Sequence, residues 1–526
     1  MAYCSVIRDL GSGERFLSGW SIRSETAIRE RLAKLSKQFY LPYDWGEPLA
    51  AGAESWENVS VSAGYTYLAQ FVAHDCVHSN IPTTCLGGHR PAPKNYRSSP
   101  LALETLYGGG PDGCAHALRS HRTSGYRQSR LRLGRMRNLQ KSEQKCPFRD
   151  IPRTRGADDE GSELTVAVLA DDRNDNNAIV SQMTVLFAML HNAVADLIEE
   201  NFEPGRTPDL AHELRFFDAA RQTCIGIYRR IVENDLMRAL LHPLVYERYR
   251  SGSGPVIDRD GSRRMPIEFA LAMRFGHAMV RPHYRINSYH DRREQLVDVL
   301  LTSGRGRPWR MPLDESWIVQ WSRFFAVSAQ TVNHSRRIGP SMSTDLLSSL
   351  VFDRVDDTNA VGVFYRDLIF GALVPVPTVS ALIAHFKALC PGLVESSPLL
   401  SDEQYRIAAF QRWLEERKAV TGLSSLEIGE ISRDPPLVAF VLLEAAMEAS
   451  GRHLGVLGSH LIAEPIFGVL ADSKNQAGNA APYQLPHSSA PPGFSKRPFD
   501  DIESMADLIL FVAERQSDAR EIVPIV

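Results

Sequence analysis

The chain has 526 residues, of which 44% are hydrophobic and 23% are charged. These proportions are typical of soluble globular proteins, and they exclude a largely disordered chain, a collagen and a coiled-coil rod. The 59 Lys and Arg nearly balance the 62 Asp and Glu, which leaves a net charge of −3, so no overall field favours nucleic acid or an anionic membrane as a partner.

The seven cysteines are widely spaced and include no CxxC pair, which argues against a disulfide scaffold and against a four-cysteine zinc site. The N-terminal sequence MAYCSVIRDLGSGERFLSGW lacks the apolar stretch of a signal peptide. No segment approaches the ~18 consecutive apolar residues of a membrane span. We therefore expect a cytoplasmic protein that is neither exported through the Sec pathway nor inserted in a membrane.

The first distinctive segment is AGYTYLAQFVAHDCVHSN at residues 63–80. His74 and His78 are four residues apart and would share one face of a helix. Zinc binds such pairs, but this segment lacks the glutamate of an HExxH motif and offers no obvious third ligand. The spacing alone therefore favours a buried structural histidine.

Residues 119–155 contain twelve Lys or Arg against two acids and few large apolar residues. No helical or strand period is apparent in this segment. The composition favours a solvated surface segment over an arm that binds a polyanion or a partner protein.

Residues 171–196 read DDRNDNNAIVSQMTVLFAMLHNAVAD. The apolar residues recur every three or four positions, which predicts an amphipathic helix with one buried face. Asp175 or Asn176 could cap its start. Arg173, just before the helix, is either an ordinary surface cation or, in a pocket, a group that stabilises negative charge.

A second apolar helix is predicted from Pro266, a favourable first helical position, to the residues before Pro282. His277 follows Gly276 within it. Gly destabilises a helix interior by roughly 1 kcal/mol relative to Ala, so its presence suggests that something approaches the backbone closely. A flat cofactor or a packed neighbouring helix would both do so.

Further helices are predicted at residues 402–420, 436–450 and 502–516, and residues 475–498 are a linker rich in Pro, Ser, Gly and Ala. Strand patterns are scarce, so we expect a mainly α protein with little β structure and long irregular connections. We divide it into an N-terminal extension (1–54), one large helical domain (55–475) and a linker with a C-terminal helix packed on that domain (476–526).

Several motifs, in this order, resemble those of the animal-type haem peroxidase superfamily, specifically its bacterial members. They are TYLAQFVAHD (66–75), LYGGGPDG (106–113), FRDIPRT (148–154), DDRNDNN (171–177), MRFGHAM (273–279), RIGP (337–340), YRDLIFGALVPVPT (365–378) and the helical segment 436–470. The resemblance covers about residues 55–475. It implies the haem peroxidase-like fold for this domain.

The resemblance also implies a catalytic set around a haem. His74 would lie on its distal side, with Arg173 as the distal arginine and Gln70 in the polar pocket. His277 would bind the iron from the proximal side. His74 would move a proton between the two oxygens of hydrogen peroxide while Arg173 stabilises charge.

On the proximal side, the family orients the iron-binding His with an Asn, and here Asp367 occupies that position. A carboxylate there should make His277 more electron-rich and lower the iron potential. Relatives that oxygenate fatty acids carry a radical-forming Tyr three residues before the proximal His. This chain has Arg274 there, as in the peroxidases.

Two departures from the family bear on the cofactors. Mammalian members tether haem by esters from an Asp before the distal His and a Glu after the distal Arg, but here these positions are Ala73 and Asn176. We therefore expect haem b held without covalent links. A family calcium site would use Asp75, but Ala102 stands where a second acid is expected, so we expect no calcium.

The sequence therefore predicts a haem peroxidase that reduces hydrogen peroxide and oxidises a halide or a small organic electron donor, within a biosynthetic pathway. No nucleic acid partner is expected. Two alternatives stay open: a haem-dependent oxygenase acting on a lipid or small metabolite, and a haem-binding protein without turnover.

Overall fold

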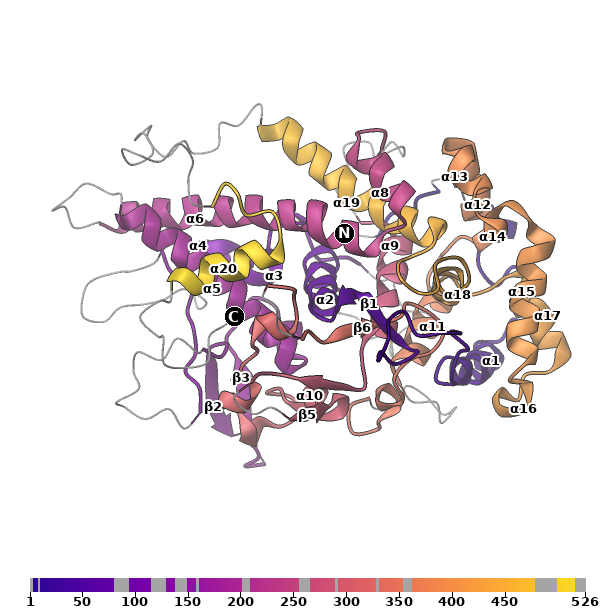
Figure 1. Ribbon diagram of the computed structural model, residues 1–526, viewed down its shortest axis with the longest axis horizontal. Coiled ribbons are helices and arrows are strands. Elements are labelled where there is room, and N and C mark those ends of the chain that lie inside the picture. Colours follow the sequence, from indigo (N-terminus) through magenta and orange to yellow (C-terminus); the bar gives the residue numbers. More distant parts are fainter. Residues whose placement is uncertain are drawn as a thin grey trace.

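The computed structural model describes residues 3–7, 10–79, 94–114, 129–137, 149–157, 160–200, 209–254, 265–288, 292–327, 331–352, 362–477 and 499–515. Helices dominate these residues, and the described strands form three separate two-stranded pairs. The mainly α fold expected from the sequence is confirmed. Irregular connections join the helices where the chain is described: residues 39–56, for example, contain no helix or strand (Figure 1).

The centre of the molecule is built on helix α2 (Gly64–Cys76), which packs against α5 (Ala178–Glu200). Gly64 opens α2 where a Cβ atom would lie 2.5 Å from the Phe324 carbonyl oxygen, so a larger residue would not fit. Phe71 of α2 stacks on Phe187 of α5, with ring centroids 4.9 Å apart. This packing fixes the end of α2 that carries His74.

Helix α5 is the predicted amphipathic helix, but it is buried around most of its circumference and not on one face alone. The Asn177 side chain caps its start by accepting the N–H groups of Ile179 and Val180. Among the described residues α5 is the one helix long and apolar enough to cross a membrane, and 94% of its most apolar stretch is buried inside the protein.

Helix α6 (Leu210–Ile231) lies along α5 and continues through a π-helical turn, η6 (Val232–Leu236), into α7 (Met237–Leu240). Helices α8 (Pro243–Arg250) and α19 (Val456–Ala477) pack on each other beside it. The C-terminal helix α20 (Met505–Arg515) packs against α5, close to its predicted bounds. Most of the predicted 475–498 linker lies outside the described residues.

The predicted helix at Pro266 to Val280 differs from the observed one. An α-helix, α9, covers only Ile267–Ala272, with Pro266 as the residue before its first turn, and a tighter 3₁₀ helix, η7, covers Met273–Met279. The change of helix type falls on the segment that holds Gly276, the poorest helix former in it. In a 3₁₀ helix, side chains three residues apart lie directly above one another.

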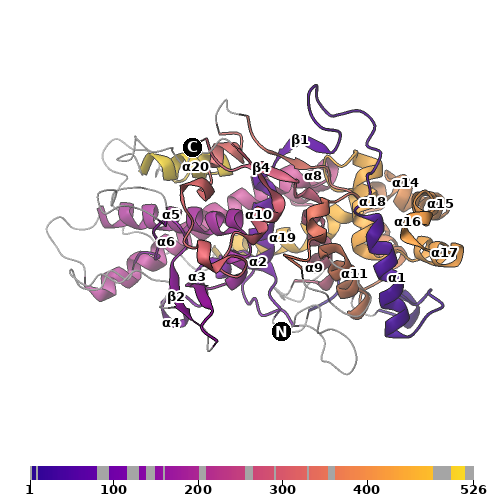
Figure 2. The ribbon, with the colours of Figure 1, turned by 90° about the horizontal axis from the view of Figure 1, so that it is seen from below.

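Helices from the C-terminal third gather at one end of the molecule with α1 (Glu25–Gln38), opposite α5 and α6, as the view from below shows (Figure 2). These helices are α11 (Val363–Leu373), α12 (Val379–Leu389), α13 (Pro391–Glu395), α14 (Pro398–Ser401), α15 (Glu403–Glu415), α16 (Lys418–Thr421), α17 (Ser425–Arg433) and α18 (Leu437–Ala449). The predictions for 402–420 and 436–450 agree with α15, α16 and α18.

Helix α1, from the predicted N-terminal extension, is packed into this end of the molecule. Leu32 and Leu35 of α1 are fully buried in the same hydrophobic core as α2 and α5. The Arg31 guanidinium forms an ion pair with Glu430 of α17, with 2.5 Å between the charged atoms. The described part of residues 1–54 therefore shares one core with the rest of the chain.

The strand pairs are all antiparallel: β1 (Glu57–Ser62) with β6 (His334–Arg336), β2 (Arg153–Ala157) with β3 (Glu163–Ala167), and β4 (His283–Arg285) with β5 (Arg293–Gln295). Short helices fill the connections: η1 (Ser12–Glu14), α3 (Glu104–Tyr107), α4 (Gly110–Gly113), η5 (Asp172–Asp175), α10 (Leu296–Leu301), η8 (Pro308–Arg310), η9 (Glu315–Trp317), η10 (Trp321–Arg323) and η11 (Thr344–Leu347).

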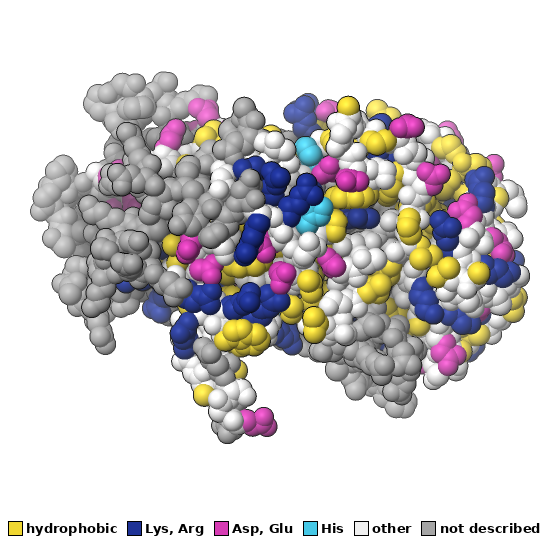
Figure 3. Space-filling view, turned by 60° about the horizontal axis from the view of Figure 1, so that its bottom comes forward, with side chains coloured by type: hydrophobic (Ala, Val, Ile, Leu, Met, Phe, Trp, Pro, Cys, Tyr) yellow, Lys and Arg dark blue, Asp and Glu magenta, His cyan; other side chains and the backbone are white. Residues whose placement is uncertain are grey.

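The basic segment 119–155 is not simply solvated where the structure describes it. Arg130 is 2% exposed and forms ion pairs with Asp196 and Glu199. Arg153 is held between Asp150 and Asp175. Several of these cations therefore cross-link the fold. On the face drawn in Figure 3, Lys and Arg side chains are interspersed with Asp and Glu, so the charge is mixed locally as well.

Candidate active site

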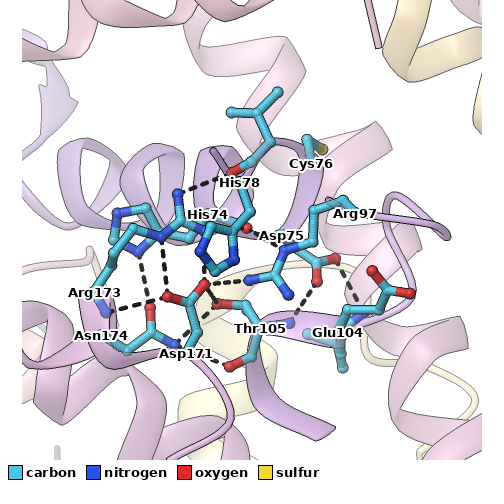
Figure 4. Close-up of polar contacts among 12 residues, drawn as sticks. His74, Asp75, Cys76, His78, Arg97, Glu104, Thr105, Asp171, Arg173 and Asn174 are labelled. Carbon is cyan, nitrogen blue, oxygen red and sulfur yellow. Dashed lines mark hydrogen bonds and ion pairs between the residues drawn. The ribbon is translucent and has the colours of Figure 1, made fainter. Parts of the chain in front are cut away.

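His74 lies near the C-terminal end of α2 with its side chain buried (Figure 4). Its ring Nδ1 is 2.8 Å from the side-chain oxygen of Asn174, which can only accept. The Asn174 amide is oriented by its own nitrogen, which donates to the Thr105 hydroxyl at 3.1 Å. The hydrogen-bond network therefore assigns the proton of His74 to Nδ1 and leaves a lone pair on Nε2.

The imidazole of His74 is neutral. Burial lowers its pKa to about 3, and the nearby Arg173 cation acts in the same direction. A neutral imidazole with one unprotonated nitrogen is a proton acceptor across the physiological pH range.

Arg173 belongs to η5, and its guanidinium closes the end of α2. It donates to the carbonyl oxygens of Val77 and His74 at 2.8 and 2.9 Å. It also makes a two-pronged ion pair with Asp171, at 2.9 and 2.7 Å. Arg173 therefore lies beside His74, as the sequence motifs imply, but most of its donors are bound to protein groups.

A second arginine completes this cluster. Arg97 donates from Nε to the His74 carbonyl at 2.8 Å and pairs with the same carboxylate, that of Asp171. Asp171 is fully buried, and its hydrogen bonds and charge interactions with Arg173 hold the pKa of the carboxyl well below its usual range despite burial. One buried anion thus holds two cations against the end of α2.

The remaining residues predicted on this side lie around the same helix end. Gln70 is half-buried, and its side-chain oxygen is 3.4 Å from the Asn177 amide nitrogen. Ala73 is half-buried, whereas Asn176 is exposed and its backbone N–H donates to the Arg173 carbonyl at 3.1 Å. Neither Ala73 nor Asn176 carries a carboxylate.

The carboxylate of Asp75 faces residues 101–107. Its two carboxylate oxygens accept the backbone N–H groups of Leu103 and Thr105, each at 3.0 Å. Burial raises the pKa of this carboxyl to about 6. Within the described residues, no group of three His, Cys, Asp or Glu side chains is arranged to hold a metal ion.

The second part of the site is on η7. His277 Nδ1 is 2.7 Å from one carboxylate oxygen of Asp367, on α11, and Arg274 pairs with the other oxygen. Arg274 and His277 are three residues apart, so the 3₁₀ geometry places both on one face of η7. Asp367 is fully buried, whereas 37% of the His277 side chain is exposed.

Open space borders His277. A Cβ atom built on Gly276 would meet no described atom within 4 Å, so a packed neighbouring helix is not the reason for this glycine. Nε2 of His277 makes no hydrogen bond to any residue that the structure describes. The ring is thus partly exposed, and its Nε2 is unengaged among the described residues.

The two parts of the site adjoin each other. Helix α2 packs against η7. Burial raises the pKa of Tyr3 to about 12, and the positive charges of Arg274 and Arg173 both act against this rise. The phenol of Tyr3 is thus within electrostatic range of one arginine from each part.

The sequence profile of the animal haem peroxidase family matches residues 58–356. The chain belongs to this family. A comparison with curated protein sequences found no match.

Solved structures with the haem peroxidase fold are similar to this chain at low sequence identity. Peroxidase A from Dictyostelium discoideum is 13% identical with a TM-score of 0.52, covering 89% of this chain and 86% of that one. Fatty acid alpha-dioxygenase from Arabidopsis thaliana is 13% identical with a TM-score of 0.51, covering 92% and 77%. The enzyme of that name from Oryza sativa is 12% identical with a TM-score of 0.52, covering 88% and 77%. At these identities the likeness shows the shared fold.

Membership of the haem peroxidase family implies a haem cofactor, and the residues present fit one. An axial ligand to haem iron needs an unengaged imidazole nitrogen with space in front of it. His277 offers both, together with a carboxylate on its other nitrogen. The His277 ring is exposed although its partner Asp367 is fully buried. A flat group bound over the ring would bury it.

Sequence reasoning missed four residues of the candidate site: Tyr3, Arg97, Asp171 and Asn174. Asp171 and Asn174 are both part of the DDRNDNN motif, so their proximity to Arg173 in the sequence was the available signal. Arg97 and Tyr3 have no local signal. They reach the site from segments about 76 and 170 residues away from Arg173, by subtraction of the residue numbers.

Proposed function

We propose that this haem peroxidase family member is a peroxidase: it reduces hydrogen peroxide and oxidises a halide or a small organic electron donor, within a biosynthetic pathway. His74 is the proton-transfer group, His277 would hold the haem iron, and Arg173 would stabilise negative charge beside His74. The observation that carries the proposal is a neutral, buried His74 whose Nδ1 is bonded to Asn174.

The hydrogen bonds define what His74 can do. Because Asn174 holds the proton on Nδ1, the lone pair on Nε2 can accept a proton from hydrogen peroxide. The protonated imidazole can then give the same proton to the departing oxygen, which leaves as water. The Asn174 oxygen stabilises the imidazolium while it exists, and the buried Asp171 carboxylate balances its charge.

Arg173 supports this step electrostatically. Its guanidinium is a fixed cation beside His74 that favours the neutral imidazole and the binding of an anionic oxygen species. Its bonds to Asp171 and to two carbonyl oxygens preorganise it, so it does not need to be reoriented in each turnover.

On the proximal side, a haem bound to His277 would supply the two electrons that cleave the oxygen–oxygen bond. The chain contributes the orientation of the ligand, since Asp367 accepts from Nδ1 and directs Nε2 toward the open space. The charge on Asp367 also increases the electron density of the imidazole, although Arg274 shares the same carboxylate.

We propose a haem b without covalent links, because neither Ala73 nor Asn176 can form an ester with it. We include no calcium ion. Both oxygens of Asp75 are taken by backbone N–H groups, and Ala102 supplies no side-chain ligand.

The alternative is an oxygenase, since the similar structures include fatty acid alpha-dioxygenases. Arg274 weighs against it, because oxygenating relatives resemble this chain but carry a radical-forming Tyr at that position. Here Arg274 is engaged with the carboxylate behind the axial ligand. This contact favours the peroxidase.

The test is the absorption spectrum of the haem-loaded protein before and after one equivalent of hydrogen peroxide. We expect a Soret band that shifts within the mixing time.

His277→Ala should lose the haem or hold it weakly, whereas His74→Ala should keep it and react with peroxide ~10²–10⁴-fold more slowly. His78→Ala is the matched control and should react at the parent rate. A His74→Ala protein that reacts at the parent rate would exclude His74 as the proton-transfer group, and oxygen uptake with a fatty acid but no peroxide reaction would identify an oxygenase.

A further inference from the structure

A pocket of about 200 Å³ lies outside the site described above, between α1, α15 and α18, and is open to solvent on one side. Trp413 of α15 and Leu443 and Met447 of α18 form its apolar part. Four charged residues line it as well, two basic and two acidic: Arg412, Arg417, Asp44 and Glu416. The pocket therefore suits a small molecule that has an apolar body, a polar group and no large net charge.

A series of aromatic rings runs inward from this pocket. Trp413 meets Phe39 edge to face, with ring centroids 5.2 Å apart, and Phe39 contacts Phe364 with centroids 3.8 Å apart. Phe364 lies in the first turn of α11, three residues before Asp367 and therefore on the same side of the helix. Asp367 is 2.7 Å from His277. Each step from the pocket to the proximal histidine is a direct contact or one helical turn.

Hydrogen bonds hold these rings in place. The side-chain nitrogen of Gln38, the last residue of α1, donates to the Trp413 carbonyl at 2.9 Å. The hydroxyl of Tyr40 accepts the backbone N–H of Phe364 at 3.1 Å. Trp413 is only 8% exposed and Phe39 is fully buried. The pathway is thus rigid, and it reaches the surface only at the pocket.

We infer that this pocket is a second electron-donor site, which binds a monocyclic phenol or aromatic amine and passes its electrons through Trp413 toward the haem. The inference rests on the proposed peroxidase function and deepens it by naming a donor class. A cavity of about 150 Å³ accommodates benzene, so one substituted ring fits about 200 Å³, whereas a long-chain fatty acid does not. Of the three rings in the series, Trp413 alone lines the pocket, and its indole is more readily oxidised than the phenyl rings of Phe39 and Phe364.

The electrons and atoms balance as in any peroxidase cycle. One hydrogen peroxide takes up two electrons and two protons and becomes two waters. Trp413 gives one electron to the oxidised cofactor, becomes a radical cation and is restored by one electron from the phenol, which loses its hydroxyl proton to the water in the open pocket. Two phenol molecules are oxidised per peroxide.

The experiment combines freeze-quench electron paramagnetic resonance with steady-state kinetics on the haem-loaded full chain, with 2-methoxyphenol as the donor. The parent should show a tryptophanyl radical within milliseconds of peroxide addition, and 2-methoxyphenol should quench it. Trp413→Phe keeps the packing, should lose that radical, and should oxidise 2-methoxyphenol at least ten-fold more slowly. Its reaction with peroxide itself should be unchanged. Trp309→Phe, at a tryptophan that is 60% exposed and off this series, is the control and should behave as the parent.

A second variant tests the pocket without touching the ring. Met447→Trp fills the cavity from α18 and should weaken the binding of 2-methoxyphenol, seen as a raised KM, while the tryptophanyl radical still forms. An unchanged radical and unchanged phenol oxidation in Trp413→Phe would overturn the inference, as would a tyrosyl radical that only Tyr40→Phe abolishes. Failure of the parent to react with peroxide would instead overturn the proposed function, so the two failures are distinguishable.

Discussion

His74 differs from an ordinary histidine in both its protonation state and its tautomer. Burial and the Arg173 cation hold it neutral, and Asn174 fixes which nitrogen carries the proton. A proton acceptor with a low pKa is a weak base in water, but hydrogen peroxide needs only a transient acceptor that returns the proton in the same step. His74 is therefore a weaker base than an ordinary histidine, but it stays unprotonated and able to accept a proton at lower pH.

This leads to a prediction on pH. At pH 5 a histidine with an ordinary pKa is about 97% protonated and inactive as a base, whereas one with a pKa of about 3 is about 1% protonated. The rate constant of the reaction with peroxide should therefore be flat from pH 8 down to pH 5 and fall only as the pH drops below about 4. Stopped-flow measurements at constant ionic strength check this. A thirty-fold fall between pH 8 and pH 5 would show that Arg173, Arg97 and Asp171 do not keep the imidazole neutral.

Asp367 is the residue whose charge should tune the cofactor. Asp367→Asn keeps an acceptor for His277 Nδ1 but removes the negative charge. We expect the Fe(III)/Fe(II) potential to rise by at least ~60 mV, since about 59 mV is a ten-fold change in a one-electron equilibrium. Spectroelectrochemical titration measures it.

Arg274→Gln gives the matched comparison. It removes the cation that competes with His277 for Asp367, so the potential should move the other way and fall. If both substitutions shift the potential in the same direction, the carboxylate does not act through the histidine.

At the scale of an element, the end of α2 depends on a charge cluster more than on the helix itself. The last turn of α2 carries His74, and its carbonyl oxygens receive Arg97 and Arg173, which both pair with the buried Asp171. Removing one partner from a buried ion pair leaves an uncompensated charge, which typically costs about 3–5 kcal/mol.

Asp171→Ala should therefore lower the free energy of unfolding by about 3 kcal/mol, measured by urea denaturation, and loosen the position of His74. Asp172→Ala is the control at the next residue, which is exposed, and it should change the free energy by no more than about 0.5 kcal/mol. Equal effects of the two substitutions would mean that Asp171 does not anchor the helix end.

The 3₁₀ winding of the short helix η7 also contributes to the geometry of the site. Its 3₁₀ winding stacks Arg274 directly above His277, and both reach one carboxylate. In an α-helix the two side chains would share a side but be offset by about 60° around the axis. The helix type, and not only the residues, builds the proximal side of the site.

At the scale of the whole molecule, the haem has to be held by packing and by His277, because Ala73 and Asn176 offer no carboxylate for an ester. We expect acidified butanone to extract the haem completely. The protein left behind should have the 58.7 kDa mass of the polypeptide alone in mass spectrometry. A mass increased by one haem would contradict non-covalent binding.

The sequence alone determined those features that depend on local order. The spacing of apolar residues predicts α5, α15, α18 and α20, because a helix face is set by neighbours three and four positions away. Short motifs such as TYLAQFVAHD and MRFGHAM indicate the family, and the family implies haem. Such motifs can be read from the sequence because the residues of each one are neighbours along the chain.

Only the tertiary structure decided which residues far apart in the sequence form ion pairs and hydrogen bonds. Arg97 and Asp171 meet across 74 residues, and Arg130, expected at a solvated surface, is buried against acids of α5. It also set the winding of η7 and the open space at Gly276. The physical reason is that ion pairs and packing act through space at a few ångströms, and residue order places no limit on which side chains come that close.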